Sequence, residues 1–525
     1  MFGAALLVAG TVLTAGGAYA QPSPTPGRHS AGQGEDDNTQ GDQGDQGDQG
    51  SQGDQGGKQG DHGKGKPRTG ESPSAGPSRR AEPPAATPGG SGSPLAHPVP
   101  ATGAVLATAE NGPEAAVPTA QGLQQALAPA LADKNLGTVT IAVADAAGGQ
   151  LLYGSGENTA ATPASTTKLA TTVAALSLIP GDTRLTTRVV RGADPGTVTL
   201  VGGGDPTLTA LPVDQVQIGG QPANADTAPA SLEALARQTA AALKAAGTTT
   251  VKLDYDLSMY AVNPQDKKPD NQNLALVVPL MVDEAKVDPK SREEAPDRVA
   301  DPAGAAAEAF AKLLAAQGVT VEGKAKPAAA PAAADAAVLG KVDSPTVARL
   351  VERLLTTSDN QLAEAIARQV ALAAHQPASF EGAATAVTQE LAKLGVPMTG
   401  VVLNDGSGLD TGNGIPPAVL VRLLALAASE QHPALRPVLT GLPVAGFTGT
   451  LDKRYGSGSG AADAAGLIRA KTGTLRNVNT LAGTVVDADG RLLVFAVMTR
   501  TSAPADTARA AMDRIAAHLA ACGCH

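Results

Sequence analysis

The feature that most constrains this chain is a long N-terminal stretch that cannot form a hydrophobic core. Residues 21–117 are rich in Gly, Pro, Gln, Asp and Ser, contain a Gly-Asp-Gln repeat at 41–49, and have almost no large apolar side chains. Folding of such a segment would not offset its loss of conformational entropy. We therefore expect residues 21–117 to be a disordered tether, and the folded part to begin near Pro118.

The segment before the tether predicts export. Residues 2–19 are uncharged and mostly apolar, and Ala18-Tyr19-Ala20 supplies small residues where a signal peptidase would cut. We expect residues 1–20 to be a cleaved signal peptide and the mature protein to lie in the cell wall, a periplasm-like space or the extracellular medium. The alternative is an uncleaved anchor, and only that alternative predicts membrane association.

Charge and cysteine content argue against several partners. The formal net charge is -10 at pH 7, which gives no electrostatic reason to expect nucleic acid as a partner. Cys522 and Cys524 stand among the last four residues, and no other part of the sequence forms a Cys/His cluster. We therefore expect no metal and no cofactor, and a frayed terminus in which the two cysteines could form a vicinal-type disulfide.

A Ser-x-x-Lys tetrapeptide, Ser165 to Lys168, is the first candidate for chemistry. Pro163 suits the first position of a helix, and apolar residues follow at helical spacing. Ser165 and Lys168 would then share one helix face, with the hydroxyl beside an amine that could deprotonate it. An isolated match of this kind is usually a helix cap followed by a solvated lysine.

Two further motifs change that interpretation. Ser358-Asp359-Asn360 lies at a predicted helix junction, and Lys471-Thr472-Gly473-Thr474 lies in a predicted strand. Ser-x-x-Lys, Ser-Asp-Asn and Lys-Thr-Gly in this order are the signature of class A β-lactamases and penicillin-binding proteins. The combination indicates a serine acyltransferase site.

The remaining patterns predict an α+β fold. Strand patterns near both ends of the folded part, at 139–153 and 468–499, predict one antiparallel sheet flanked by helices. We expect a catalytic domain formed by residues 118–184 and 341–525. Residues 185–340 alternate helical and strand patterns, and we expect them to form one or two smaller inserted α/β domains between the first and second motifs.

Two local predictions concern the helices next to the second motif. Ser344-Pro345 is typical of a helix cap and first residue, so a helix should begin there. The helix after Asn360 should be amphipathic, with Glu364 and Arg368 on its polar face.

Beyond the three motifs, further segments match signatures of one family. They are Gly-Gly-Gly-Asp-Pro-Thr-Leu at 202–208, Asp-Gly-Ser-Gly-Leu at 405–409, Leu-Pro-Val-Ala-Gly at 442–446, Gly-Thr-Leu at 449–451, and Ala-Lys-Thr-Gly-Thr-Leu at 470–475. Over about residues 123–519 the chain resembles the class C, low-molecular-mass penicillin-binding proteins, the D-alanyl-D-alanine carboxypeptidase/endopeptidase family. The 193 positions between Ser165 and Ser358 also agree with a family that carries inserted domains at this point.

The residues themselves suggest how a serine site could work here. Ser165 is the candidate nucleophile, and Lys168 must act as the base because the three motifs contain no histidine. A lysine base requires a neutral amine, and burial together with a second cation, Lys471, could lower its pKa sufficiently. Lys471, Thr472 and Thr474 suit a terminal carboxylate, such as that of D-alanine.

The resemblance implies the other roles. Ser358 would relay a proton to the leaving amine, and Asn360 would bind the substrate backbone and hold Lys168. Gly473 would let the substrate approach the strand edge. The backbone N–H groups of Ser165 and Thr474 would form the oxyanion hole.

The implied function is an exported serine D-Ala-D-Ala carboxypeptidase that acts on peptidoglycan stem peptides through an acyl-enzyme on Ser165, with β-lactams as inhibitors. Endopeptidase activity on cross-links is an additional expectation, and the sequence leaves the balance of the two open. Two alternatives remain at this point. One is a β-lactamase or esterase on the same scaffold, which rapid hydrolysis of the penicillin acyl-enzyme would favour. The other is a catalytically silent wall-binding or sensor module.

Overall fold

The computed structural model describes residues 115–261, 273–293 and 295–525. These residues belong to one compact unit, Ala96–His525. The predicted signal peptide, and the predicted tether as far as residue 114, lie outside the described residues. Within the described ranges, no helix combines the length and apolar character needed to cross a bilayer. The fold is α+β, as the sequence predicted.

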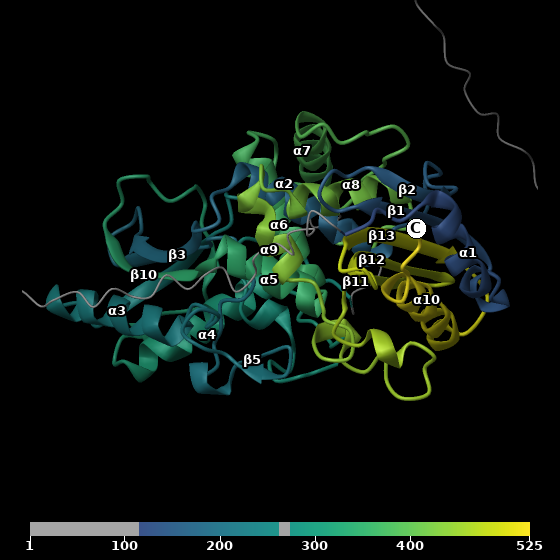
Figure 1. The fold of residues 1–525 in the computed structure, drawn as a ribbon. Coiled ribbons are helices and arrows are strands. Elements are labelled where there is room, and N and C mark those ends of the chain that lie inside the picture. The colour runs from purple at the N-terminus through teal and green to yellow at the C-terminus, as the bar shows by residue number, and fades with distance from the viewer. Residues whose placement is uncertain (1–114, 262–272, 294) are drawn as a thin grey trace, which may run out of the picture. The chain divides into compact units, whose positions relative to one another are not determined.

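Five antiparallel strands form the first sheet, in the order β11-β12-β13-β1-β2 (Figure 1). The strands are β1 (Thr138–Asp145), β2 (Leu151–Ser155), β11 (Ile468–Leu475), β12 (Val478–Val486) and β13 (Leu492–Arg500). The pairing of β1 with β13 joins the two ends of the folded part in one sheet. The sheet therefore places β11, which carries the Lys-Thr-Gly motif, at an edge.

The two faces of this sheet pack against different helices. Ile141 and Phe495 point toward α1 (Ala120–Leu131) and α10 (Ala505–Ala520). Ala142 and Ala496, which alternate with them, face the helical layer on the other side. The small side chains on that second face allow the helices to approach closely.

The helical layer lies on that second face of the sheet and carries the first two motifs. It contains α2 (Thr167–Leu178), α5 (Val347–Thr357), α6 (Asn360–Ala373), α7 (Phe380–Lys393), α8 (Pro417–Ala428) and α9 (Arg436–Thr440). Its core consists almost entirely of Ala, Val, Leu and Ile. Asp359 caps the start of α6, accepting a hydrogen bond from the N–H of Leu362 at 2.9 Å.

The second sheet follows the order β10-β3-β4-β7-β8, with β9 also paired to β7. Its strands are β3 (Arg184–Arg191), β4 (Thr197–Val201), β7 (Thr250–Asp256), β8 (Thr320–Val321), β9 (Lys326–Pro327) and β10 (Val338–Thr346). The helices α3 (Leu232–Ala245) and α4 (Pro302–Ala316) share its hydrophobic core. A short hairpin, β5 (Gln217–Ile218) and β6 (Gln221–Pro222), stands apart from this sheet. The domain limits 185–340 remain a prediction.

Two local predictions about the helices next to the second motif were wrong. Ser344-Pro345 lies inside β10, and α5 begins three residues later, capped by Thr346. The side chain of Ser344 is occupied elsewhere, because it accepts a hydrogen bond from the N–H of Leu185. Glu364 and Arg368 are buried rather than solvated, because their charges pair with each other.

The C-terminus is not frayed. Cys522 and Cys524 form a disulfide, and Cys522 is buried. The carbonyl of Cys524 accepts a hydrogen bond from the N–H of Thr119 at 2.7 Å. This backbone contact holds the end of the chain against the start of the folded part.

Candidate active site

Ser165 lies in a tight turn immediately before α2. The turn is the 3-10 helix η2 (Ala164–Thr166), with Pro163 as its cap residue. Ala164 has a left-handed backbone with φ of 47°, a strained conformation for an alanine. The carbonyl of Pro163 accepts a hydrogen bond from Thr480 Oγ1 of β12 at 2.8 Å. This bond fixes the nucleophile candidate against the sheet.

Lys168 is fully buried and has three neutral hydrogen-bond partners. Its Nζ lies 2.8 Å from Ser165 Oγ, 2.7 Å from Asn360 Oδ1 and 2.7 Å from the carbonyl oxygen of Ser407. We call these four residues the Lys168 site. Burial lowers the pKa of Lys168 to about 8, although the carboxylates of Asp405, Glu364 and Asp359 oppose the shift.

The Ser407 carbonyl is held by a buried ion pair that sequence reasoning missed. Glu364 Oε1 accepts hydrogen bonds from the N–H groups of Gly406 and Ser407 at 3.1 and 2.9 Å. Its other oxygen pairs with Arg368 Nη1 at 2.7 Å, and the Arg368 guanidinium lies over the ring of Phe380. Because each charge has partners, the pair can be buried where an amphipathic pattern predicts solvent.

The loop at 405–409 is ordered by its aspartate. Asp405 is buried, and its carboxylate accepts hydrogen bonds from the N–H groups of Gly408 and Asp410 and from the side chain of Asn413. Its signature was recognised in the sequence, but its role was not. The loop supplies one of the three partners of Lys168.

Ser358 and Asn360 come from the junction of α5 and α6. Ser358 ends α5 with a left-handed backbone, φ 61° and ψ 31°, which turns its side chain toward β11. Its Oγ accepts a hydrogen bond from Lys471 Nζ at 2.8 Å. Asn360 begins α6 and reaches Lys168. The second motif therefore contacts both of the others.

The third motif lies on β11, beside the turn that carries Ser165. Lys471 is buried, whereas Thr472 and Thr474 are half-buried on the same side of the strand. A Cβ added at Gly473 would lie 2.9 Å from the carbonyl oxygen of Pro163 and 2.9 Å from the N of Ser165. A glycine is needed here because the strand approaches the nucleophile turn this closely.

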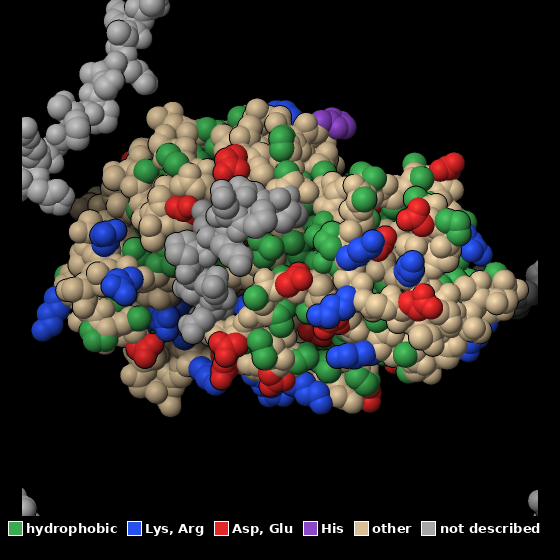
Figure 2. All heavy atoms as spheres, turned by 180° about the vertical axis from the view of Figure 1, so that it is seen from behind, with side chains coloured by type: hydrophobic (Ala, Val, Ile, Leu, Met, Phe, Trp, Pro, Cys, Tyr) green, Lys and Arg blue, Asp and Glu red, His purple; other side chains and the backbone are tan. Residues whose placement is uncertain are grey.

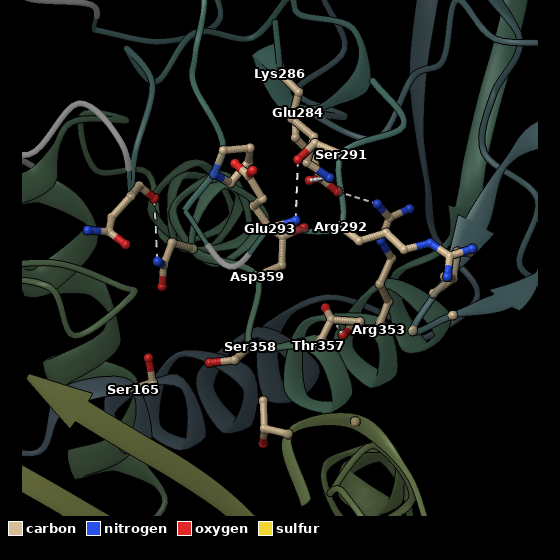
Figure 3. A pocket seen from close by; sticks show the side chains of 18 of the residues that line it. Ser165, Glu284, Lys286, Ser291, Arg292, Glu293, Arg353, Thr357, Ser358 and Asp359 are labelled. Atoms are coloured by element: carbon tan, nitrogen blue, oxygen red, sulfur yellow. Dashed lines mark hydrogen bonds and ion pairs between the residues drawn. The ribbon is translucent and has the colours of Figure 1, made fainter. Parts of the chain in front are cut away.

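The three motifs open into one groove of about 1520 Å³. Ser165, Ser358, Asn360, Thr472, Gly473 and Thr474 all line it. Figure 3 shows the Ser358 side chain pointing toward Ser165 across this groove. Lys168 and Lys471 join these residues through their contacts with Ser165, Asn360 and Ser358, so the structure brings the candidate site residues of the three motifs together. The oxyanion role of the Ser165 and Thr474 N–H groups remains a prediction.

A second buried charged group adjoins the 358–360 turn. Glu284 forms ion pairs with Arg353 and with Lys286, the latter at 2.8 Å, and its carboxylate is hydrogen-bonded to that of Asp359 (Figure 3). We call these four residues the Glu284 cluster. Burial opposes the ionisation of Glu284, but the two cations outweigh it and hold the pKa of this carboxyl well below its usual range. Burial and the charge of Glu284 raise the pKa of Asp359 to about 6.

The backbone that presents Glu284 is unusual. Asp283, Glu284 and Ala285 have consecutive positive φ values of 51°, 57° and 60°. Such conformations cost roughly 1 to 3 kcal/mol each in non-glycine residues. The turn is held by side-chain contacts, including a hydrogen bond from Thr209 Oγ1 to Asp283. Sequence patterns gave no signal for this cluster.

Charges on the surface are mixed. On the face drawn in Figure 2, Lys and Arg side chains are interspersed with Asp and Glu, and no single sign dominates. Among the described residues, no group of three or more His, Cys, Asp or Glu side chains is arranged to hold a metal ion.

Comparison with known proteins identifies the family. The model of the D-Ala-D-Ala carboxypeptidase 3 (S13) family matches residues 123–296 and 289–519. Carboxypeptidase DacB of Mycolicibacterium smegmatis is 36% identical over 413 residues, which are 77% of this chain and 85% of the relative. A carboxypeptidase of Mycobacterium tuberculosis is 34% identical over 415 residues, covering 77% of this chain and 84% of the relative. The chain belongs to the D-Ala-D-Ala carboxypeptidase 3 (S13) family, and it is a serine-type peptidase.

Solved structures support the same fold. Penicillin binding protein 4 of Haemophilus influenzae matches with a TM-score of 0.58 at 20% identity, over 76% of this chain and 98% of that protein. The same protein complexed with a β-lactam matches with a TM-score of 0.53 at 21% identity, over 75% of this chain and 97% of that protein. The α+β architecture is therefore that of the penicillin-binding proteins.

Proposed function

We propose that this carboxypeptidase removes the terminal D-alanine of peptidoglycan stem peptides through an acyl-enzyme on Ser165. The observation that carries the proposal is the contact between Lys168 Nζ and Ser165 Oγ at 2.8 Å, with the amine fully buried. With a pKa of about 8, about a tenth of the Lys168 side chains are neutral at pH 7. An ordinary lysine would supply less than a thousandth.

The partners of Lys168 orient its lone pair. A neutral amine has two N–H donors and one lone pair. Asn360 Oδ1 and the Ser407 carbonyl can only accept, so they take the two donors. The lone pair then faces the hydroxyl of Ser165, whose proton it removes as Ser165 Oγ attacks the carbonyl carbon of the penultimate D-alanine.

The other two motifs complete the reaction. The N–H groups of Ser165 and Thr474 stabilise the oxyanion of the tetrahedral intermediate. Ser358 Oγ accepts a hydrogen bond from Lys471, so its own O–H is directed toward the groove, where it protonates the leaving amine of D-alanine. Ser358 then receives the proton that Lys168 took from Ser165, which returns Lys168 to its neutral form. The C–N bond breaks, and the acyl group stays on Ser165. Water then attacks the ester, with Lys168 as base, and Ser165 recovers its proton.

β-Lactams would acylate the same oxygen, because their strained amide carbonyl fits the same groove. Stem peptides occur outside the cytoplasm, and we propose that the folded part works there.

Ser165→Ala tests the assignment of the nucleophile, with the exposed Ser155→Ala as control. We expect Ser165→Ala to release no D-alanine from a diacyl-L-Lys-D-Ala-D-Ala peptide and to take up no label from a fluorescent penicillin, whereas Ser155→Ala does both. Fast turnover of the penicillin adduct would instead favour a β-lactamase.

A further inference from the structure

The end of β11 that faces the groove is accompanied by a cation from a distant part of the chain. Arg509 lies near the start of α10, and its Nη2 donates a hydrogen bond to Thr474 Oγ1 at 3.2 Å. Arg509 lines the same groove as Ser165 and Thr472. Its side chain is 33% exposed, in contrast to the fully buried Lys471.

The position of Lys471 limits what it can do for a substrate. Its ammonium donates hydrogen bonds to Ser358 Oγ and to the carbonyl of Thr472, both at 2.8 Å. These bonds tie Lys471 to the proton relay. At the Thr474 end of the groove, Arg509 hydrogen-bonds the motif and remains accessible to solvent.

The partners of Arg509 leave it able to take a ligand. Its other terminal nitrogen pairs with Asp506 at 3.1 Å, but the Asp506 side chain is 95% exposed. Exposed pairs of this kind contribute little, so a substrate carboxylate can replace Asp506. The helix backbone is fixed, because the carbonyl of Arg509 accepts a hydrogen bond from Arg454, which is itself paired with Asp513.

The hydroxyls beside Arg509 complete a carboxylate site. Thr474 Oγ1 accepts its hydrogen bond from Arg509, so its O–H proton is directed elsewhere, toward the groove. Thr472 presents its hydroxyl two residues earlier on the same side of the strand. A guanidinium and two hydroxyls match the planar acceptor geometry of a carboxylate.

We propose that Arg509 binds the free carboxylate of the terminal D-alanine. It thereby selects peptide substrates that end in a free carboxylate at this position. The inference rests on the proposed function. It predicts that a peptide whose terminal carboxylate is replaced by a neutral carboxamide is a poorer substrate, because the carboxamide offers Arg509 no charge.

The test compares two peptides that differ only at the end, diacyl-L-Lys-D-Ala-D-Ala and its C-terminal carboxamide. We expect Arg509→Gln to lower kcat/KM for the acid by about 10- to 100-fold, mainly through KM, and to leave the carboxamide unchanged. Arg509→Lys should retain part of the preference, because it keeps the charge but loses the planar fork. Arg514→Gln, on the same helix but paired with Asp133, is the matched control and should behave as the wild type.

A second variant avoids any loss of folding. Asp506→Asn removes the competing carboxylate at a fully solvated position, and we expect it to lower KM for the acid about twofold without affecting the carboxamide. Equal losses for both peptides in Arg509→Gln, or an unchanged acid-to-amide ratio in both variants, would overturn the inference. If the wild type released no D-alanine from the acid at all, the proposed function itself would fail instead.

Discussion

The Lys168 site and the Glu284 cluster are both buried, both charged and both in contact with the 358–360 turn, but they are built from different partners. Lys168 is surrounded at hydrogen-bond distance by a hydroxyl, an amide oxygen and a backbone carbonyl. Glu284 has two cations beside it. Burial therefore lowers the pKa of Lys168, whereas ion pairing keeps Glu284 ionised. The difference separates a group that can exchange a proton from one that holds structure.

The largest effect is expected from removing the Lys168 amine. We expect Lys168→Met to slow acylation by a fluorescent penicillin by at least about 10³-fold, because Ser165 then has no base within reach. The exposed Lys244→Met on α3 should retain the wild-type rate. Stopped-flow fluorescence measures both. Acylation of Lys168→Met within tenfold of the wild type would show that another group takes the proton.

Lys168→Met should also change how the free energy of unfolding depends on pH. Because the folded-state pKa of Lys168 is about 8 and its usual value is 10.5, the unfolded chain binds more protons between these pH values. The free energy of unfolding of the wild type, relative to Lys168→Met, should therefore rise by about 3 kcal/mol from pH 8 to pH 10.5. Urea unfolding at several pH values measures it. A flat difference would mean that burial does not perturb the amine.

For the Glu284 cluster the expected effect is on stability at neutral pH. Glu284→Gln removes the buried carboxylate that pairs with Arg353, whose side chain is only 16% exposed, so the free energy of unfolding should fall by about 2 to 4 kcal/mol. Glu352→Gln is the matched control, because Glu352 pairs with the half-exposed Arg349 on the same helix as Arg353. It should cost less than about 1 kcal/mol. Similar losses in the two variants would remove the distinction between the buried cluster and a surface pair.

The sequence predicts the reacting residues of this site better than the residues that hold them in place. Ser165 and Lys168 are three residues apart in one helical turn, so local periodicity alone places them together. The strands at the two ends were also predictable, because their turns and apolar patterns are local. The helical pattern predicts that Glu364 and Arg368 lie on a solvated face. It cannot show that the two charges are buried and paired with each other, because their burial depends on tertiary packing.

Other features depend on contacts between distant segments. Arg509 and Thr474 are 35 residues apart, and nothing in the pattern of α10 indicates that its first turn reaches the motif strand. Glu284, which contacts Asp359, stands in a turn where three consecutive residues adopt a left-handed backbone, and no sequence pattern predicts this turn. Ser344-Pro345 imitates a helix start, but the pairing of β10 with β3 outweighs the local signal.

The role of Lys168 as the base for Ser165 is tested most directly by the pH dependence of acylation, with the modified residue located by mass spectrometry of the penicillin-labelled protein. We predict an adduct on Ser165 and a rate constant that rises with pH to a plateau, with a midpoint near pH 8, because the neutral form of Lys168 is the base. An adduct on another residue, or a rate constant that is the same from pH 6 to pH 10, would contradict it.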